Sequence, residues 1–194
     1  MNKEKELIDK LIDLAFAEDI GDGDHTTLSC IPATAMGKSK LLIKEAGVLA
    51  GIEVAKEIFN RFDPTMKVEV FINDGTEVKP GDVAMVVEGK VQSLLQTERL
   101  MLNVMQRMSG IATMTRKYAK KLEGTHTRVL DTRKTTPGMR ILEKMAVKIG
   151  GGVNHRIGLF DMILLKDNHV DFAGGIDKAI TRAKEYCKEK GKDL

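Results

Sequence analysis

The chain has 194 residues, of which 42% are hydrophobic, 30% charged and 4% aromatic, and its formal net charge is +3. This length allows one large domain or two small ones, with a core built mostly from aliphatic side chains and methionines. The longest apolar runs are far shorter than the roughly 20 residues of a membrane span, the charged N-terminus is no secretory signal, and Cys30 and Cys187 lack metal-ligand spacing, so we expect a cytoplasmic protein without membrane contacts.

The first half of the chain predicts a domain of mixed helices and strands. Apolar residues at helical spacing predict a helix over residues 7–15, and turn-forming residues predict a loop over residues 18–27. The next predicted elements are a strand over 38–46, a helix over 51–62 that stops before Pro64, and strands over 68–72 and 83–87.

Turn residues over 73–82 predict a β-hairpin. Lipoyl and biotinyl carrier modules share this pattern, but they present a modifiable lysine beside a methionine at the hairpin tip. This sequence has no such tip, so a plain hairpin in a small sheet is favoured.

The second half of the chain predicts strands that alternate with helices. A long helix is expected over 94–122, with a break or kink at Ser109-Gly110. It is followed by a strand at 128–131, a helix at 139–149, a strand at 162–165 and a helix at 176–190. This alternation is typical of a parallel sheet or barrel, so we predict an N-terminal domain over 1–108 and an α/β domain over 109–194.

Positive charge gathers between residues 131 and 166. This stretch holds only three acidic residues against seven cations, which are Arg133, Lys134, Arg140, Lys144, Lys148, Arg156 and Lys166. A local excess of fixed cations suggests an anionic ligand, either nucleic acid or a small polyanion. A nucleic-acid module would also be expected to carry stacking aromatic residues, and Phe160 alone in residues 128–169 counts against that alternative.

The cations follow the ends of the two predicted strands, where ligands bind in α/β folds. An isolated Arg-Lys pair is usually a solvated surface feature. Here Arg133 and Lys134 directly follow a strand and lie among the hydroxyls of Thr132, Thr135 and Thr136, which favours a binding role. Lys166 and His169 occupy the second strand-end loop. Lys166 as a Schiff-base lysine is a minor alternative, because no companion carboxylate pattern supports that role.

A glycine-rich link over 150–152 precedes a further cationic pair, His155-Arg156. Three glycines permit positive φ and close backbone approach, although such a run is most often a helix stop. His155 adds a group that titrates near neutral pH.

Four segments together resemble the quinolinate phosphoribosyltransferase family. They are EDIGDGDHTT (18–27), TERLMLNVMQRMSGIAT (97–113), DTRKTTPGMR (131–140) and GGGVNHRIGLFDMILLKDNH (150–169). Each segment alone is a modest signal. In this order and spacing, over nearly the whole chain, the set is specific.

The resemblance implies an N-terminal α+β open sandwich followed by an incomplete α/β barrel of the type II phosphoribosyltransferase kind. It also implies transfer of the phosphoribosyl group of phosphoribosyl pyrophosphate to quinolinate with decarboxylation, magnesium as cofactor, and a homodimer or larger homo-oligomer without nucleic acid. Lys134 and Lys166 match catalytic positions. The residues that match substrate-binding positions are Arg99 (reaching the neighbouring subunit), Thr132, Arg133, Lys134, His155, Arg156 and Lys166.

The family pattern continues beyond Leu194 with further barrel strands, acidic residues near the ribose and magnesium, and glycine-rich phosphate loops. The resemblance therefore assigns no metal ligand in this sequence, and we expect no turnover by these 194 residues alone. Two alternatives stay open: a related pyrophosphorylase linked to molybdenum transport, and a non-catalytic anion-binding fragment that folds only with a partner.

Overall fold

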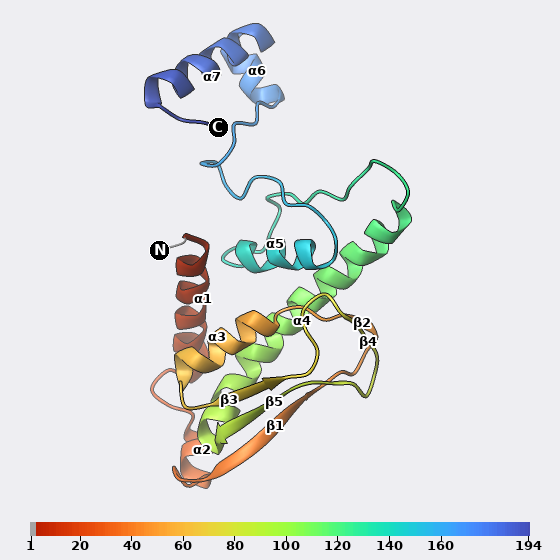
Figure 1. The fold of residues 1–194 in the computed structure, drawn as a ribbon. Helices are drawn as coiled ribbons and strands as arrows, with labels where there is room; N and C mark the ends of the chain where they lie inside the picture. The colour runs from red at the N-terminus through yellow and green to blue at the C-terminus, as the bar shows by residue number, and fades with distance from the viewer. Residues whose placement is uncertain (1–2) are drawn as a thin grey trace. The chain divides into compact units, whose positions relative to one another are not determined.

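The computed structural model describes residues 3–194 and divides into two compact units, Met1–Asn154 and His155–Leu194. The first unit holds helices α1 to α5 and the strands β1 to β5, and the second holds α6 and α7 (Figure 1). This mixture of helices and strands agrees with the predicted fold class. The predicted domain boundary after residue 108 lies inside the long helix α4.

The N-terminal segment forms two helices separated by a short turn. α1 (Lys3–Ile20) extends beyond the predicted helix. α2 (His25–Cys30) begins after Asp24, whose carboxylate accepts a hydrogen bond from the backbone N–H of Thr27 at 3.0 Å. An aspartate at this position is a favourable N-cap. The loop predicted over 18–27 is therefore wrong in its extent, because both helices extend into it.

A three-stranded antiparallel sheet forms the first layer of the N-terminal part. Its strand order is β1 (Met36–Leu42), β5 (Val83–Lys90), β3 (Lys67–Val70), so the last strand in the chain lies in the middle. Val87 of β5 is paired on one side with Ser39 and on the other with Val68. The strands predicted in these three regions are confirmed, with different ends.

The hairpin predicted over residues 73–82 is wrong. β4 (Glu77–Val78) pairs with β2 (Gly47–Val48) in a separate two-stranded sheet and does not pair with β5. This pairing continues beyond β2, where the N–H of Leu49 donates to the carbonyl of Thr76 at 3.0 Å. The turn residues were read correctly as turns, but the partner strand is distant in sequence.

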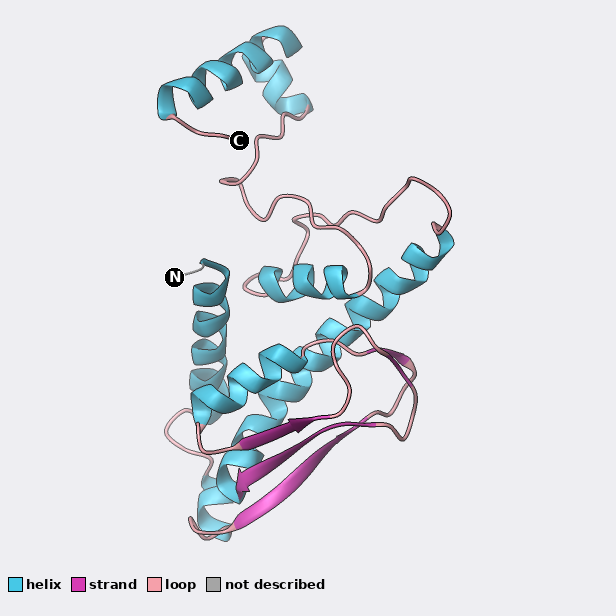
Figure 2. Ribbon diagram, viewed as in Figure 1, coloured by secondary structure: helices cyan, strands magenta, loops and turns pink. Residues whose placement is uncertain are grey.

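Two helices, α3 (Ile52–Phe62) and α4 (Val91–Lys121), pack against one face of the sheet (Figure 2). Apolar side chains of both helices and of β5 form the first core, which includes Ile52, Ala55, Phe59, Ala84, Met85, Val87, Leu94, Met101 and Met105. Apolar burial of this kind is the main favourable term in folding. The helix predicted over 51–62 is confirmed, and the arrangement is an α+β open sandwich.

The long helix α4 runs without a break through Ser109 and Gly110, where a kink was predicted. The Ser109 hydroxyl accepts a hydrogen bond from the N–H of Ala50 at 3.0 Å and donates to the carbonyl of Ala50 at 3.1 Å. Ser109 therefore fastens the segment before α3 to the helix, and the serine-glycine pair does not interrupt α4.

A parallel crossover follows α4. Leu130 forms a parallel bridge with Val153, and α5 (Arg140–Ile149) lies between them in the chain. α5 packs on α4 and α1 through a second core that includes Ile12, Val104, Met108, Ala112, Leu142 and Ala146. The helix predicted at 139–149 is confirmed. The strand predicted at 128–131 is wrong in its extent, because only Leu130 pairs there, through a single parallel bridge to Val153.

The segment that pairs with Leu130 in this crossover is not the predicted strand at 162–165. Residues 162–165 form no strand, and the partner of Leu130 is Val153, directly after the glycine-rich link. A strand exists only where a neighbour satisfies its backbone groups. The apolar run at 162–165 suggested burial but could not show whether such a neighbour exists.

The second unit contains a helical hairpin. α6 (Asp167–Ala173) and α7 (Ile176–Lys190) are joined at Gly174 and Gly175, whose φ angles are +81° and +121°. Glycine adopts these angles without the cost that a Cβ atom would impose. The helix predicted at 176–190 is confirmed. In residues 3–194 no helix is long and apolar enough to cross a membrane.

Candidate functional site

The residues that follow Leu130 begin a loop, residues 131–140, which we call the cationic loop. Its first residue, Asp131, forms a buried ion pair with Lys144 of α5, and the two side chains are 7% and 3% exposed. In the amide orientation that satisfies both acceptors, Asn154 donates to Asp131 Oδ2 and to the carbonyl of Lys144, both at 2.8 Å. The start of the loop is therefore fixed to α5 and to the residue after Val153.

The far part of the cationic loop is held by a second group. Glu143 of α5 accepts hydrogen bonds from Arg107 Nε and Nη2 of α4 at 2.9 and 2.7 Å. Its other oxygen accepts from the N–H of Thr136 at 3.3 Å, and Arg107 Nη2 also donates to the Thr136 hydroxyl at 3.2 Å. α4, α5 and the loop are thus joined through one carboxylate.

The electrostatics of Glu143 follow from this environment. Burial would raise the pKa of Glu143, but the hydrogen bonds from Arg107 and Thr136 outweigh burial and hold this pKa below its usual range. A carboxylate that accepts several hydrogen bonds from positive or N–H donors favours its ionised form. Glu143 is therefore an anion paired with Arg107.

Between these two attachments lie the residues predicted to bind an anion. The Thr132 hydroxyl accepts a hydrogen bond from the N–H of Lys134 at 3.0 Å, and Arg140 Nε donates to the Thr135 hydroxyl at 3.0 Å. Arg133 Nε is buried and has no hydrogen-bond partner, one of two such side-chain atoms in residues 3–194. A buried donor without an acceptor is costly, so Arg133 is suited to receive one from a ligand.

Three predicted residues lie in the second unit. Arg156 is buried and donates from Nη1 to the carbonyl of Met162 at 3.2 Å, whereas His155 is half-buried. Lys166 is exposed and is the N-cap residue of α6, and its N–H donates to His169 Nδ1 at 3.1 Å. The strand-end loop predicted for Lys166 and His169 is wrong, because α6 begins at the next residue, Asp167.

The last predicted residue, Arg99, is exposed on α4 and is separated in sequence from the cationic loop. Within the first unit the structure thus brings Thr132, Arg133 and Lys134 together on one loop, and it places Arg99 on a different element. His155, Arg156 and Lys166 follow in the second unit.

Sequence reasoning missed the residues that hold the cationic loop. Lys144, Glu143 and Asp131 entered only a count of charges, and Arg107 was not considered at all. Arg107 is 36 positions from Glu143 and 29 from Thr136. One signal was available: in the amphipathic pattern of 139–149, Glu143 and Lys144 sit beside apolar positions and both prove to be buried.

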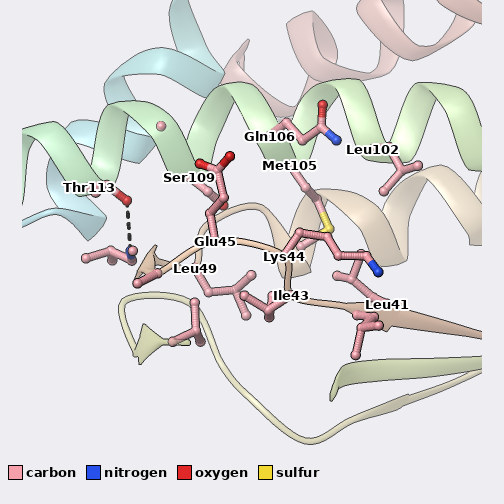
Figure 3. A pocket seen from close by; sticks show the side chains of 16 residues that line it. Leu41, Ile43, Lys44, Glu45, Leu49, Leu102, Met105, Gln106, Ser109 and Thr113 are labelled. Carbon is pink, nitrogen blue, oxygen red and sulfur yellow. Dashed lines mark hydrogen bonds between the residues drawn. The ribbon is translucent and has the colours of Figure 1, made fainter. Parts of the chain in front are cut away.

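A separate cavity of about 540 Å³ lies between α4 and the segment that joins β1 to β2 (Figure 3). Apolar side chains such as Leu102 and Met105 form much of its wall. The hydroxyl of Thr113 accepts a hydrogen bond from the N–H of Val48 at 2.8 Å. The lining residues all fall within 41–113 of the described chain and include none of the predicted ligand residues.

Comparisons with known proteins extend over both halves of the chain. The family model described as the quinolinate phosphoribosyl transferase N-terminal domain matches residues 24–109, and the C-terminal domain model matches residues 111–192. The two matches meet inside α4. A quinolinate phosphoribosyltransferase [decarboxylating] 1b of Nicotiana tabacum is 47% identical over 181 residues, which are 92% of this chain and 51% of the relative.

A nicotinate-nucleotide pyrophosphorylase [carboxylating], chloroplastic, of Oryza sativa subsp. japonica is 48% identical over 183 residues, 93% of this chain and 48% of the relative. The chain thus spans about half the length of the curated relatives that it matches. The crystal structure of NadC from Streptococcus pyogenes superposes with a TM-score of 0.87 at 42% identity, covering 93% of this chain and 64% of that one.

These similarities define the structural class of the chain. The open sandwich, the crossover after α4 and the cationic loop belong to the α/β fold of the phosphoribosyltransferases, so the predicted fold class is confirmed. The chain belongs to the quinolinate phosphoribosyltransferase family.

Proposed function

We propose that this chain belongs to an enzyme that transfers the phosphoribosyl group of phosphoribosyl pyrophosphate to quinolinate. The products are nicotinate mononucleotide, carbon dioxide and pyrophosphate, so the reaction serves NAD biosynthesis. The observation that supports this proposal best is the unpartnered buried Nε of Arg133 on a loop held at two points. Family membership supports the same reaction.

The substrate suits the loop in charge and shape. Quinolinate carries two carboxylates on adjacent ring carbons, and a guanidinium group presents parallel donors that match a carboxylate. We assign substrate binding to Arg133, with Thr132 and Lys134 beside it on the loop. The family pattern extends the same role to His155, Arg156 and Lys166, residue by residue.

The chemistry needs charge placement more than a nucleophile. Departure of pyrophosphate leaves positive charge on the ribose, and the pyridine nitrogen of quinolinate then forms the new bond to the ribose carbon. Loss of carbon dioxide from the ring carbon next to that nitrogen follows, because the adjacent positive nitrogen stabilises the electron pair left on that carbon, which then takes up a proton from solvent. We assign Lys134 and Lys166 as catalytic residues that stabilise the departing negative charge, since preorganised charges are often the largest catalytic term.

Magnesium is part of the proposal as the cofactor. Mg²⁺ is commonly held by substrate phosphates together with one or two carboxylates. In residues 3–194 no three His, Cys, Asp or Glu side chains gather as a metal site. The described residues therefore supply no ready-made metal site, and we assign no ligand and no catalytic step to the ion.

We also propose that the chain acts as a homodimer or larger homo-oligomer in which Arg99 contributes to the neighbouring subunit's site. Its exposure on α4 leaves the guanidinium accessible to another chain. A cytoplasmic location belongs to the same proposal. Some plant relatives carry the word mitochondrial or chloroplastic in their names.

Calorimetric titration with quinolinate and with nicotinate, which lacks one of the two carboxylates, tests the proposal. We expect saturable binding of quinolinate and much weaker binding of nicotinate, because each carboxylate that pairs with a guanidinium adds a charge-assisted hydrogen bond. Arg133→Ala should weaken quinolinate binding by about 30-fold or more, since removing one partner of a buried charged contact costs roughly 2–5 kcal/mol. Arg128→Ala removes an exposed cation nearby in sequence and serves as the control. Equal binding of the two acids, or equal loss in both variants, would contradict the proposal.

A further inference from the structure

The buried ion pair between Asp131 and Lys144 needs a physical explanation. Both side chains are almost fully removed from solvent. Taking two charges out of water is expensive, and replacing such a pair with apolar side chains of similar volume is often neutral or stabilising. Stability alone is therefore a weak reason for this pair, and its location offers a better one.

The pair lies directly before a segment that the proposed function uses. Asp131 is followed directly by Thr132, Arg133 and Lys134. Its N–H donates to the carbonyl of Val153 at 3.1 Å. The next residue after Val153 is Asn154, whose amide donates to both members of the pair at 2.8 Å.

We infer that Asp131, Lys144 and Asn154 form a positioning triad for the substrate-binding loop. The inference rests on the proposed function. The triad fixes the last backbone position before the Thr132–Lys134 segment. A misplacement of about 1 Å in a binding group can cost on the order of 100-fold in rate. Support of this kind is therefore what a site made of long, flexible cationic side chains requires.

The geometry also explains why the triad contains charges. Apolar side chains would fill the same space but would not hold the loop in a single conformation. Lys144 belongs to α5 and its ammonium group pairs with Asp131, so the first residue of the cationic loop is held against that helix. Asn154 then adds hydrogen bonds to both partners. None of the three touches substrate in this account, and they act through the residues that follow them.

The test compares a double variant with the wild-type chain. Asp131→Leu combined with Lys144→Met removes both charges and leaves no unpaired charge in the core. The control is Asp13→Leu combined with Arg61→Met, which removes a more exposed hydrogen-bonded pair between α1 and α3 that involves no residue of the cationic loop. Melting temperature, quinolinate affinity and hydrogen exchange of the Lys134 and Thr136 amides are measured on each chain.

The double variant should melt close to the wild type. Its quinolinate Kd should rise by roughly tenfold to 100-fold. Exchange at the Lys134 amide should rise by about tenfold or more as the loop loses its fixed start, whereas the Thr136 amide, which donates to Glu143, should change less. The control pair should change neither quantity. In a folded double variant, either quantity remaining at its wild-type value would overturn the inference.

Two further outcomes, an unfolded double variant and a wild-type chain that binds no quinolinate, also have a defined interpretation. If the double variant does not fold, Asn154→Ala removes one tie without creating a buried charge and is judged by the same two quantities. If the wild-type chain binds no quinolinate, the proposed function fails. Amide exchange, which needs no ligand, then still decides whether the triad orders the loop.

Discussion

Arg107 of α4 and Glu143 of α5 form an ion pair, and Glu143 also accepts a hydrogen bond from the backbone N–H of Thr136. The Nη2–Oε1 distance is 2.7 Å, and the Glu143 side chain is 8% exposed whereas the Arg107 side chain is 50% exposed. Because α4 reaches the sheet and α5 carries Lys144, this pair links the open sandwich to the cationic loop. Neither residue is among the catalytic or substrate-binding positions that the family resemblance implies.

Arg107→Ala should lower the free energy of unfolding by about 1–2 kcal/mol, because Glu143 loses charge-assisted hydrogen bonds whose strength is already reduced by the solvent exposure of the Arg107 side chain. Arg107→Lys should recover only part of this loss, since an ammonium cannot reproduce the planar set of donors. Urea denaturation at neutral pH measures both values. Wild-type stability of Arg107→Ala would show that the pair does not hold the two helices.

The low pKa of Glu143 predicts a particular pH dependence. Since this pKa is lower in the folded chain than in the unfolded one, the stabilisation is present above the unfolded value of about 4.3 and is lost as pH falls through the folded value. Glu143→Gln should therefore be most destabilised relative to wild type near neutral pH, and the difference should shrink below about pH 4. Denaturation at a series of pH values, with the exposed Glu123→Gln as control, measures this. A constant difference across the series would exclude titration of Glu143 as its origin.

Helix positions were largely predictable from the sequence because they depend on local patterns. The helix at Ile176–Lys190 matches its predicted bounds, and Ile52–Phe62 differs by one residue. Strand pairing depends on partners that are distant in sequence, so β4 was assigned to the wrong neighbour and Val153 was overlooked.

The candidate site divides in the same way. Arg133 and Lys134 could be selected because cations directly after a strand are suited to ligand binding. Arg107 could not, because nothing near it in the sequence marks Glu143 as its partner. Side chains that face a ligand leave a local pattern, whereas side chains that hold such residues in place are recognisable only in the fold.

Two glycines of the same region should respond to alanine in opposite directions. A Cβ atom at Gly150 would lie 2.5 Å from the carbonyl oxygen of Ala112, so Gly150→Ala should destabilise the chain by about 1–3 kcal/mol through overpacking between α4 and α5. At Gly110, inside α4, a Cβ atom meets nothing within 4 Å. Gly110→Ala should stabilise the chain by about 0.5–1 kcal/mol. Thermal unfolding compares the two, and a stable Gly150→Ala chain would contradict the close approach of the helices.

The proposed role of Arg99 across a subunit interface is tested by mixing variants. Arg99→Ala and Lys166→Ala chains should each bind quinolinate poorly. Their hybrid dimer should regain part of the binding, because one of its two shared sites contains both intact residues. Each variant mixed with itself is the control. Hybrid dimers that form but bind no better than either parent would place Arg99 and Lys166 in the same subunit's site.

Nuclear magnetic resonance of the Arg133 side chain can follow the proposed hydrogen bond from Arg133 to quinolinate. The Nε–Hε signal of Arg133, assigned by its disappearance in Arg133→Lys, is followed while quinolinate is added. Because Nε is buried without an acceptor, this signal should shift and its exchange with water should slow, with the same Kd that calorimetry gives. A signal that stays unchanged while quinolinate saturates the chain would contradict the account.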